Sequence, residues 1–248
     1  MTKRVALVTG GNGGIGSAIC RELAARGNLV VAGYFPPEKE SAEAWQKEMA
    51  DQGISIELAG MDVSSYEDSE RAVAEVAEKF GPVEILVNCA GITRDGTLKK
   101  MPEGNWKAVM ATNLDSAFNT TRHVINGMLE KGWGRVINIA SVNGQRGQFG
   151  QANYSAAKAG MHGFTMAVAL ETAAKGITVN TVSPGYIATP MTEAMPEKVL
   201  EAIVNSVPMR RMGKPEEIAN TVAWLASEEN AYTTGANIPV NGGLFTSH

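Results

Sequence analysis

The sequence has few residues of the kinds that mark a secreted, metal-binding or membrane-spanning protein. Its 248 residues include only two cysteines and three histidines. No segment approaches the roughly 18 consecutive apolar residues that a membrane-spanning helix needs, and the N-terminus resembles no signal peptide. Two cysteines make a poor disulfide framework and fit a reducing compartment better. These absences predict a cytoplasmic protein with no metal site and no membrane contact.

An excess of positive charge is also missing. The chain has 22 Lys and Arg against 26 Asp and Glu, a formal net charge of -4, whereas a nucleic-acid-binding protein is normally basic. We therefore expect no nucleic-acid partner. What the chain does have is glycine, 27 residues in all, and these glycines are clustered. Its length fits one large domain or two small ones.

Short apolar runs rich in β-branched residues alternate with helix-like segments along the whole chain. This alternation predicts a parallel sheet with helices on both faces. The expected strands are 5–8, 29–32, 54–58, 85–87, 135–139, 178–182 and 236–240. The expected helices begin near 15, 41, 66, 106, 155 and 215, and 106–131 is expected to be one long helix. No linker or repeat interrupts the pattern. We predict an α/β fold, a single doubly wound Rossmann domain spanning 1–248, with an irregular substrate lid at 186–207.

A glycine-rich turn joins the first strand to the first helix. Gly10 allows a tight turn, Gly14 permits close backbone approach to a pyrophosphate, and Gly16 lets the helix pack close to the strand. The strict G-x-G-x-x-G spacing falls at 11, 13 and 16, a pattern that also occurs where glycine serves packing alone. The flanking strand and helix favour dinucleotide binding. The expected cofactor residues in this loop are Gly10, Asn12, Gly13, Gly14, Ile15 and Gly16.

The end of the second strand usually distinguishes NAD from NADP. An acidic residue there binds the ribose 2′-hydroxyl, and an arginine accommodates the 2′-phosphate. Here Gly33 and Tyr34 end the strand, and Glu38 is followed by Lys39, so the local charges oppose each other. The choice between NADPH and NADH remains open, and the absence of an arginine favours tolerance of NADH.

Tyr154 and Lys158 are four residues apart, which places both on one face of a helix. A protonated lysine would lower the tyrosine pKa from about 10, which suits an acid–base pair, although this spacing also arises by chance in helices. Ser141 follows a strand at the edge where parallel sheets bind ligands. Asn113 falls within an expected helix, as a solvated residue or as a polar site residue.

Together these motifs resemble the classical short-chain dehydrogenase/reductases over essentially the whole chain. The motifs that carry the resemblance are Thr9-Gly10-x-x-x-Gly14-x-Gly16, Asn88-Cys89-Ala90-Gly91, Asn113, Ser141, Tyr154-x-x-x-Lys158 and Pro184-Gly185. Their order makes the match specific, especially the spacing of thirteen residues between Ser141 and Tyr154. One departure is Cys89, where this family often has asparagine.

The resemblance implies a role for each motif. Tyr154 would protonate the ketone oxygen, Lys158 would lower the Tyr154 pKa and hold the nicotinamide ribose, and Ser141 would orient the carbonyl. Asn113 would support a water in a proton path through Lys158. The remaining cofactor contacts would be Asp62 and Val63 at the adenine, Asn88, Ala90 and Gly91 at the ribose, and Pro184, Gly185, Ile187 and Thr189 at the nicotinamide.

Segments around the site have a narrower resemblance, to the reductases that act on acetoacetyl-CoA in polyhydroxybutyrate synthesis. These segments are 92–95, 132–135, 144–151 and 183–189. The resemblance implies reduction of acetoacetyl-CoA to (R)-3-hydroxybutyryl-CoA. Beside Ser141, Tyr154 and Gly185, the residues expected to shape the acyl pocket are Asp95, Gln148, Phe149, Gln151 and Tyr186. The glutamines could instead belong to a polar loop, and the two aromatics could serve ordinary packing.

Two other functions fit the same motifs. A 3-oxoacyl-[acyl-carrier-protein] reductase would share every catalytic residue. A dinucleotide-sensing regulator without catalysis is a non-enzyme alternative, against which the intact Ser141, Tyr154 and Lys158 argue. Small residues on the Tyr154 helix permit close approach of another helix, and in this family such a face forms a homotetramer interface. These small residues are Ala156, Ala157, Ala159, Gly160 and Gly163.

Overall fold

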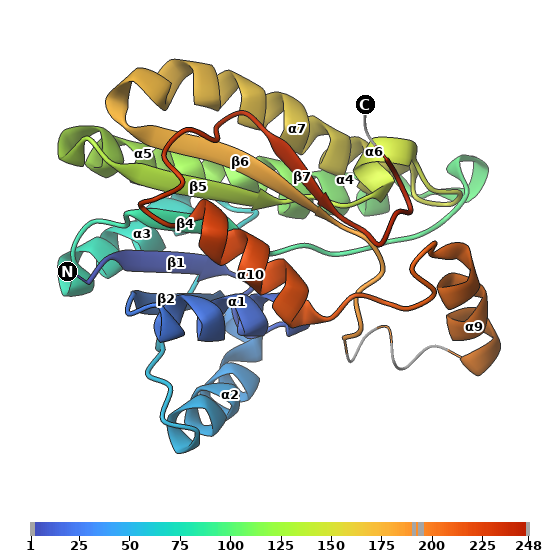
Figure 1. Cartoon of the computed structure of the whole chain (residues 1–248), viewed down its shortest axis with the longest axis horizontal. Helices are drawn as coiled ribbons and strands as arrows, with labels where there is room; N and C mark the ends of the chain where they lie inside the picture. Colours follow the sequence, from blue (N-terminus) through green and yellow to red (C-terminus); the bar gives the residue numbers. More distant parts are fainter. Residues whose placement is uncertain (1–2, 190–191, 193–195, 247–248) are drawn as a thin grey trace.

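A parallel sheet of seven strands lies at the centre of the computed structural model, which describes residues 3–189, 192 and 196–246 (Figure 1). The strand order is β3-β2-β1-β4-β5-β6-β7, and every pairing is parallel. The strands are β1 (Val5–Thr9), β2 (Leu29–Tyr34), β3 (Glu57–Gly60), β4 (Ile85–Asn88), β5 (Gly134–Ile139), β6 (Ile177–Pro184) and β7 (Asn237–Val240). The predicted α/β class and the predicted parallel sheet are confirmed.

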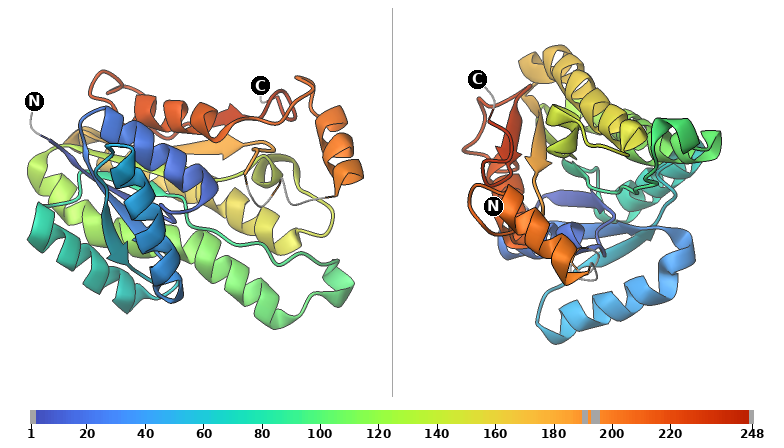
Figure 2. Two further views of the ribbon diagram at one scale, coloured as in Figure 1. Left: turned by 90° about the horizontal axis from the view of Figure 1, so that it is seen from below. Right: turned by 90° about the vertical axis from the view of Figure 1, so that its right-hand side faces the viewer.

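Helices cover both faces of this sheet, so each central strand is buried on two sides (Figure 2). The helices are α1 (Gly14–Ala25), α2 (Lys39–Asp51), α3 (Tyr66–Phe80), α4 (Glu103–Met110), α5 (Ser116–Lys131), α6 (Asn143–Arg146), α7 (Ala152–Thr172), α9 (Glu197–Ser206) and α10 (Pro215–Leu225). One core joins the sheet to α1 and α10 through Ile19, Leu23 and Ile218. The other joins it to α3 and α5 through Val76 and Met128. Burial on both faces explains why β1, β2 and β4 are nearly continuous apolar runs rather than alternating ones.

The predicted single helix over 106–131 was wrong, because a π-helical turn at Ala111–Asp115 separates α4 from α5. Asn113 lies in this turn and is fully buried. Its side chain makes two hydrogen bonds of 2.8 Å with the backbone of Ile92, one donated and one accepted. Anchoring to a segment 21 residues away is the local reason for the wider turn, and such turns are frequent at functional sites.

Other boundaries differ by a few residues from the sequence prediction. The third strand begins at Glu57, because Ile54 still belongs to the turn that ends α2, with its N–H bonded to the Met49 carbonyl. The predicted irregular lid at 186–207 contains a regular helix, α9. Part of that lid, 190–191 and 193–195, lies outside the described residues.

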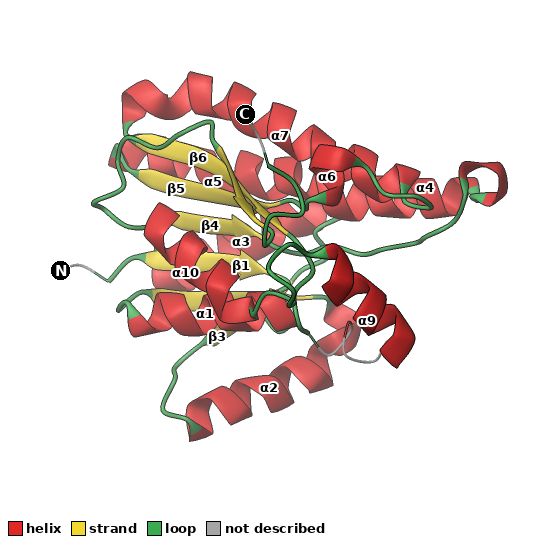
Figure 3. Cartoon of the chain, turned by 45° about the vertical axis from the view of Figure 1, so that its right-hand side comes forward, coloured by secondary structure: helices red, strands yellow, loops and turns green. Residues whose placement is uncertain are grey.

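The carboxyl ends of the strands bring together the loops that carry the predicted site residues. In Figure 3 the strand arrows point toward the side of the molecule that holds α6 and α9. The chain order of the strands reverses between β1 and β4, and ligands bind at such switch points in open α/β sheets. None of the described helices is long and apolar enough to cross a membrane.

Candidate active site

The glycine loop leaves space for an anion at the start of α1. Gly10 has a φ of +63°, a left-handed conformation that favours glycine. At Gly16 an added Cβ would overlap the Gly10 carbonyl oxygen, and at Gly11 it would lie 2.6 Å from the Ala32 Cβ. The N-cap of α1, Gly13, has no side-chain hydrogen bond, and the first turn has no acidic residue. Unblocked N–H groups at a helix N-terminus suit a phosphate, so this loop fits a pyrophosphate-containing cofactor.

Thr9 holds this loop against the segment that follows β4. Its hydroxyl accepts hydrogen bonds from the N–H groups of Cys89 and Ala90, at 3.0 and 3.1 Å. A Cβ on Gly10 would lie 3.0 Å from the Ala90 Cα. Sequence reasoning gave Thr9 only a place in a motif, although a hydroxyl at the end of a buried strand signals such a connection between loops.

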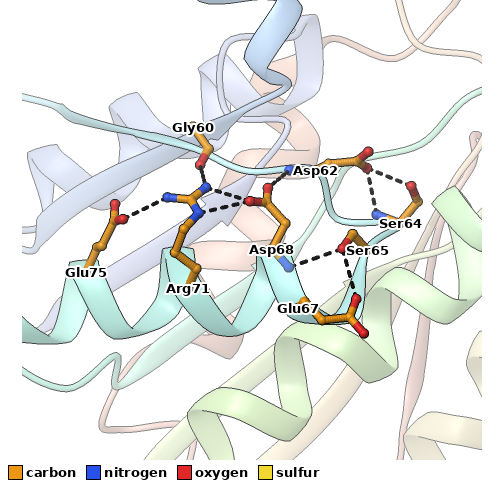
Figure 4. Close-up of polar contacts among 8 residues, drawn as sticks. All are labelled: Gly60, Asp62, Ser64, Ser65, Glu67, Asp68, Arg71 and Glu75. Atoms are coloured by element: carbon orange, nitrogen blue, oxygen red, sulfur yellow. Dashed lines mark hydrogen bonds and ion pairs between the residues drawn. The ribbon is translucent and has the colours of Figure 1, made fainter.

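On the adenosine side, a network of polar contacts fixes the backbone around Asp62 (Figure 4). The Asp62 carboxylate accepts from the Ser64 N–H at 3.0 Å and from the Ser64 hydroxyl at 2.6 Å, and the Asp62 N–H donates to Asp68 at 2.6 Å. Arg71 binds Asp68 through two nitrogens and donates to the Gly60 carbonyl at 2.9 Å. The Arg71 guanidinium and the Asp62 N–H offset the effect of burial and lower the pKa of Asp68. The predicted residue Asp62 therefore occupies a rigid turn.

The other predicted residues near the adenosine have mixed surroundings. Gly33 pairs with Thr9 in the sheet, and a Cβ there would lie 2.8 Å from the Met61 sulfur. The Tyr34 ring covers Gly60, whose added Cβ would lie 3.1 Å from the phenol oxygen. Val63 is buried, and Glu38 ends an exposed 3₁₀ turn, Pro36–Glu38. No contact among these residues distinguishes NADH from NADPH.

The Asn88 side chain points into the protein interior. It donates to Asn138 at 2.8 Å and to Thr121 at 3.3 Å, and it accepts from Thr120 at 2.6 Å. All three bonds join buried partners, so the amide is occupied by structural contacts. A ribose contact at this position would have to come from the backbone or from Ala90 and Gly91, which follow it.

Ser141, Tyr154 and Lys158 converge from β5 and α7. Lys158 is buried, and its ammonium donates to the Ile139 carbonyl at the end of β5, at 2.7 Å. The ammonium lies 5.7 Å from the centre of the Tyr154 ring. Ser141 accepts a hydrogen bond from the Asn143 N–H at 3.1 Å, and its hydroxyl is near enough to the Tyr154 phenol to affect the phenol's pKa. A buried hydroxyl, a half-buried phenol and a buried ammonium therefore share one site.

Burial dominates the electrostatics of this group. It raises the pKa of Tyr154, against the lowering effect of the neighbouring Ser141 hydroxyl, and Cys89 and Asp95 raise the pKa further. Burial also lowers the pKa of Lys158 to about 8. That Lys158 lowers the Tyr154 pKa stays a prediction. A phenol with a raised pKa stays protonated, which is the form that a proton donor needs.

The depressed pKa of Lys158 makes a prediction about stability. Between pH 8 and 10.5 the unfolded chain, with an ordinary lysine pKa of 10.5, binds more protons than the folded chain, so stability should rise with pH in this window. Lys158→Met removes this dependence. We expect the variant to be more stable than the parent at pH 7, by at most about 3 kcal/mol, with a difference that shrinks toward pH 10.5.

Urea unfolding of both proteins at pH 7 and pH 10 measures this difference. Lys175→Met, at an exposed position, is the matched control and should show no such pH dependence. A gain from Lys158→Met that stays the same at the two pH values would contradict the assigned burial of the charge.

Asn113 and the backbone of Gly91 border the same site. A Cβ on Gly91 would lie 3.3 Å from the Asn113 Oδ1 and 3.6 Å from the Lys158 nitrogen. Because both amide atoms of Asn113 are bonded to Ile92, the side chain fixes the Ile92 loop. The contact between Asn113 and a water stays a prediction.

The residues expected near the nicotinamide follow β6. Gly185 packs against the end of β7, where an added Cβ would lie 2.8 Å from the Asn241 Cα. Ile187 is buried, and Thr189 is held by Thr192, whose hydroxyl accepts from the Thr189 N–H at 2.8 Å. Tyr186 and Ile187 line a hollow of about 340 Å³ together with residues of 207–213 and 239–243. Pro184, the last residue of β6, accepts from the Val142 N–H.

The predicted acyl-pocket residues divide into two groups. The Gln151 side chain donates to the Asp95 carboxylate at 2.9 Å and accepts from Asn143 at 3.0 Å. Gln148 and Phe149 are exposed, Phe149 to 88%. The fold therefore brings Asp95 and Gln151 together, while the Phe149 side chain lies almost entirely in solvent. Sequence reasoning missed Asn143, which has no distinguishing motif beyond its place two residues after Ser141.

Comparisons with known proteins agree with this geometry. Residues 10–245 match the family model described as enoyl-(acyl carrier protein) reductase. An acetoacetyl-CoA reductase from Allochromatium vinosum is 61% identical over 98% of this chain and 98% of the relative. An acetoacetyl-CoA reductase from Cupriavidus necator is 52% identical over 98% of this chain and 99% of the relative. A 3-oxoacyl-[acyl-carrier-protein] reductase from Vibrio cholerae is 46% identical over 98% of this chain and 97% of the relative.

Proposed function

The chain belongs to the short-chain dehydrogenase/reductase family, and we propose that it reduces acetoacetyl-CoA to (R)-3-hydroxybutyryl-CoA in polyhydroxybutyrate synthesis. The observation that carries the proposal is the convergence of Ser141, Tyr154 and Lys158 beside the glycine loop. Two relatives named acetoacetyl-CoA reductase, at 61% and 52% identity, support this substrate over the carrier-protein thioester. The relative named for that thioester is 46% identical.

The proposed mechanism uses a protonated phenol and two supporting groups. Ser141 would hold the ketone oxygen through its hydroxyl, and Tyr154 would give that oxygen its proton. Bound NADH or NADPH would supply the hydride to the carbonyl carbon. Lys158, charged below pH about 8, would stabilise the negative charge left on Tyr154 after proton transfer. Ser141 and Lys158 are buried, and the lower local dielectric constant strengthens their electrostatic interactions.

The residues present fit a dinucleotide cofactor. The loop from Gly10 to Gly16 would hold the pyrophosphate, Asp62 and Val63 the adenine, and the 184–189 segment the nicotinamide. These residues accommodate either NADH or NADPH. We propose that NADH is used efficiently, because the first lysine after β2, Lys39, is ion-paired with Glu43 at 3.7 Å and is less available to a 2′-phosphate.

Steady-state kinetics with acetoacetyl-CoA and each cofactor in parallel test substrate and cofactor together. We expect turnover with both, and a kcat/KM with NADH no more than about tenfold below that with NADPH, a difference of about 1.4 kcal/mol. No turnover with either cofactor would contradict the proposed reaction. A far larger preference for NADPH would contradict only the cofactor proposal.

We also propose a homotetramer that acts in the cytoplasm, with the segment 186–207 as substrate lid. The α7 surface supports an interface, since Ala159, Gly163, Met166 and Leu170 are exposed along it. Two of the small residues expected at this interface do not belong to the exposed surface, because Ala157 is buried and Gly160 packs against Leu114. Cys20 and Cys89 are free thiols, which fits a reducing compartment.

A further inference from the structure

Three polar side chains form a hydrogen-bonded chain that ends beside the Ser141 hydroxyl. Gln151 donates through its Nε2 to the Asp95 carboxylate at 2.9 Å. Asn143 donates through its Nδ2 to the Gln151 Oε1 at 3.0 Å. The Asn143 backbone N–H then donates to the Ser141 Oγ at 3.1 Å. The chain therefore connects the loop after β4 with the end of β5.

The carboxylate at one end fixes the direction of the two hydrogen bonds between side chains in this network. An ionised aspartate can only accept, so Gln151 must turn its amide nitrogen toward Asp95 and its oxygen toward Asn143. Asn143 must then donate through its own amide nitrogen. The remaining amide oxygen of Asn143 is buried and has no hydrogen-bond partner among the described residues, so the bond to Gln151 is the contact that orients this side chain.

The backbone around the chain ties the same segments together. The Gly96 N–H donates to the Gly150 carbonyl at 2.8 Å, and Gly96 pairs with Gln151 as an isolated β-bridge. Gly144, which follows Asn143, packs so closely against α7 that an added Cβ would lie 2.7 Å from the Lys158 carbonyl carbon. The position of Asn143 is thus linked both to the front loop and to the helix that carries Tyr154 and Lys158.

We propose that Asn143 is a positioning residue for the reduction, set in place by Gln151 and Asp95; the inference rests on the proposed function. Its N–H occupies a lone pair of the Ser141 oxygen, which leaves the hydroxyl proton free to be donated to a ketone oxygen. In this role Asp95 and Gln151 orient Asn143 instead of contacting the acyl group directly. Misorienting Asn143 displaces the Ser141 hydroxyl and slows the chemical step.

Because the donors and acceptors among these three side chains are fixed, substitutions that reverse them test the proposal. In Asn143→Asp, the new carboxylate can no longer donate to Gln151, and Gln151 cannot donate to it without turning its own oxygen toward the Asp95 carboxylate. Adding Asp95→Asn removes this conflict, because the new amide at position 95 can donate to Gln151, and Gln151 can then donate to the carboxylate at position 143. Asp95→Asn alone leaves the chain intact, because asparagine also accepts through its amide oxygen.

Kinetics of the parent, the two single variants and the double variant with acetoacetyl-CoA measure the effect. We expect Asn143→Asp to lower kcat about tenfold, the upper end of what one lost hydrogen bond between neutral groups costs, with a smaller change in KM. Asp95→Asn should stay within about threefold of the parent, and the double variant should recover to a similar level. Ala152→Glu, at an exposed neighbouring position, adds a carboxylate outside the chain and should leave kcat unchanged.

Two outcomes would overturn the proposal. One is a large loss from Asp95→Asn alone, which would assign Asp95 to direct substrate contact. The other is a recovery of melting temperature in the double variant without a recovery of kcat, which would make the chain structural only. The melting temperatures of the same proteins report whether the hydrogen bonds among Asp95, Gln151 and Asn143 are intact, independently of turnover. Absence of acetoacetyl-CoA reduction by the parent protein would therefore refute the proposed function separately.

Discussion

Replacing Tyr154 with phenylalanine should lower kcat for acetoacetyl-CoA reduction by about 10²- to 10⁴-fold, the usual contribution of a positioned general acid. Burial raises the pKa of the Tyr154 phenol, so it stays protonated. Phenylalanine keeps the ring but has no proton to give. The fold and the affinity for NADH should stay close to those of the parent, which circular dichroism and the fluorescence of bound NADH measure.

Tyr232→Phe is the matched control for this prediction. Tyr232 is fully exposed, so removal of its hydroxyl should change neither kcat nor the affinity for NADH. If Tyr154→Phe retained the parent turnover, another group would have to supply the proton, and the assignment of Tyr154 as the acid would be wrong.

Gly16→Ala should weaken dinucleotide binding by about 10- to 100-fold, since forcing a methyl group into a packed site costs about 1–3 kcal/mol. A Cβ at this position overlaps the Gly10 carbonyl oxygen. Both atoms belong to backbone that cannot turn aside as a side chain would, so the loop has to open. The expected change is in the Kd for NADH measured by fluorescence titration, together with a lower melting temperature.

Gly104→Ala is the control for the substitution itself. Gly104 lies in α4, and a Cβ there meets no atom within 4 Å. Alanine favours helix more than glycine does, so this variant should bind NADH as the parent does and unfold at an equal or higher temperature. A Gly16→Ala variant with the parent's affinity would show that the loop does not hold the cofactor as proposed.

The fold could be predicted because its signals are local. Strands β1, β2 and β4 are short apolar runs, and helices such as α1 and α3 repeat their buried apolar residues on one face. The π-helical turn could not be predicted, since it depends on the Asn113 side chain meeting Ile92, a contact made only after the sheet has formed. The start of α7 at Ala152, three residues before the predicted one, likewise carries no strong capping side chain.

The sequence predicts which residues form the candidate site, but it does not predict most of the contacts that these residues make. The spacing of Ser141, Tyr154 and Lys158 indicates that they meet, whereas their pKa directions depend on burial, which spacing does not encode. From the sequence alone, the amide of Asn88 could face a ribose or the protein interior. In the structure it faces the interior, because it donates a hydrogen bond to Asn138 on the neighbouring strand. Asn143 acquires its place only through tertiary contacts with Gln151 and Asp95.

The ratio of kcat/KM for acetoacetyl-CoA to kcat/KM for the acetoacetyl thioester of acyl carrier protein tests the central claim most directly. Both substrates present the same ketone to Ser141 and Tyr154, so the ratio reports recognition of the carrier alone. The proposed function predicts a ratio above about 10, a difference of about 1.4 kcal/mol. A ratio well below 1 would contradict it and assign the chain to the carrier-protein reaction.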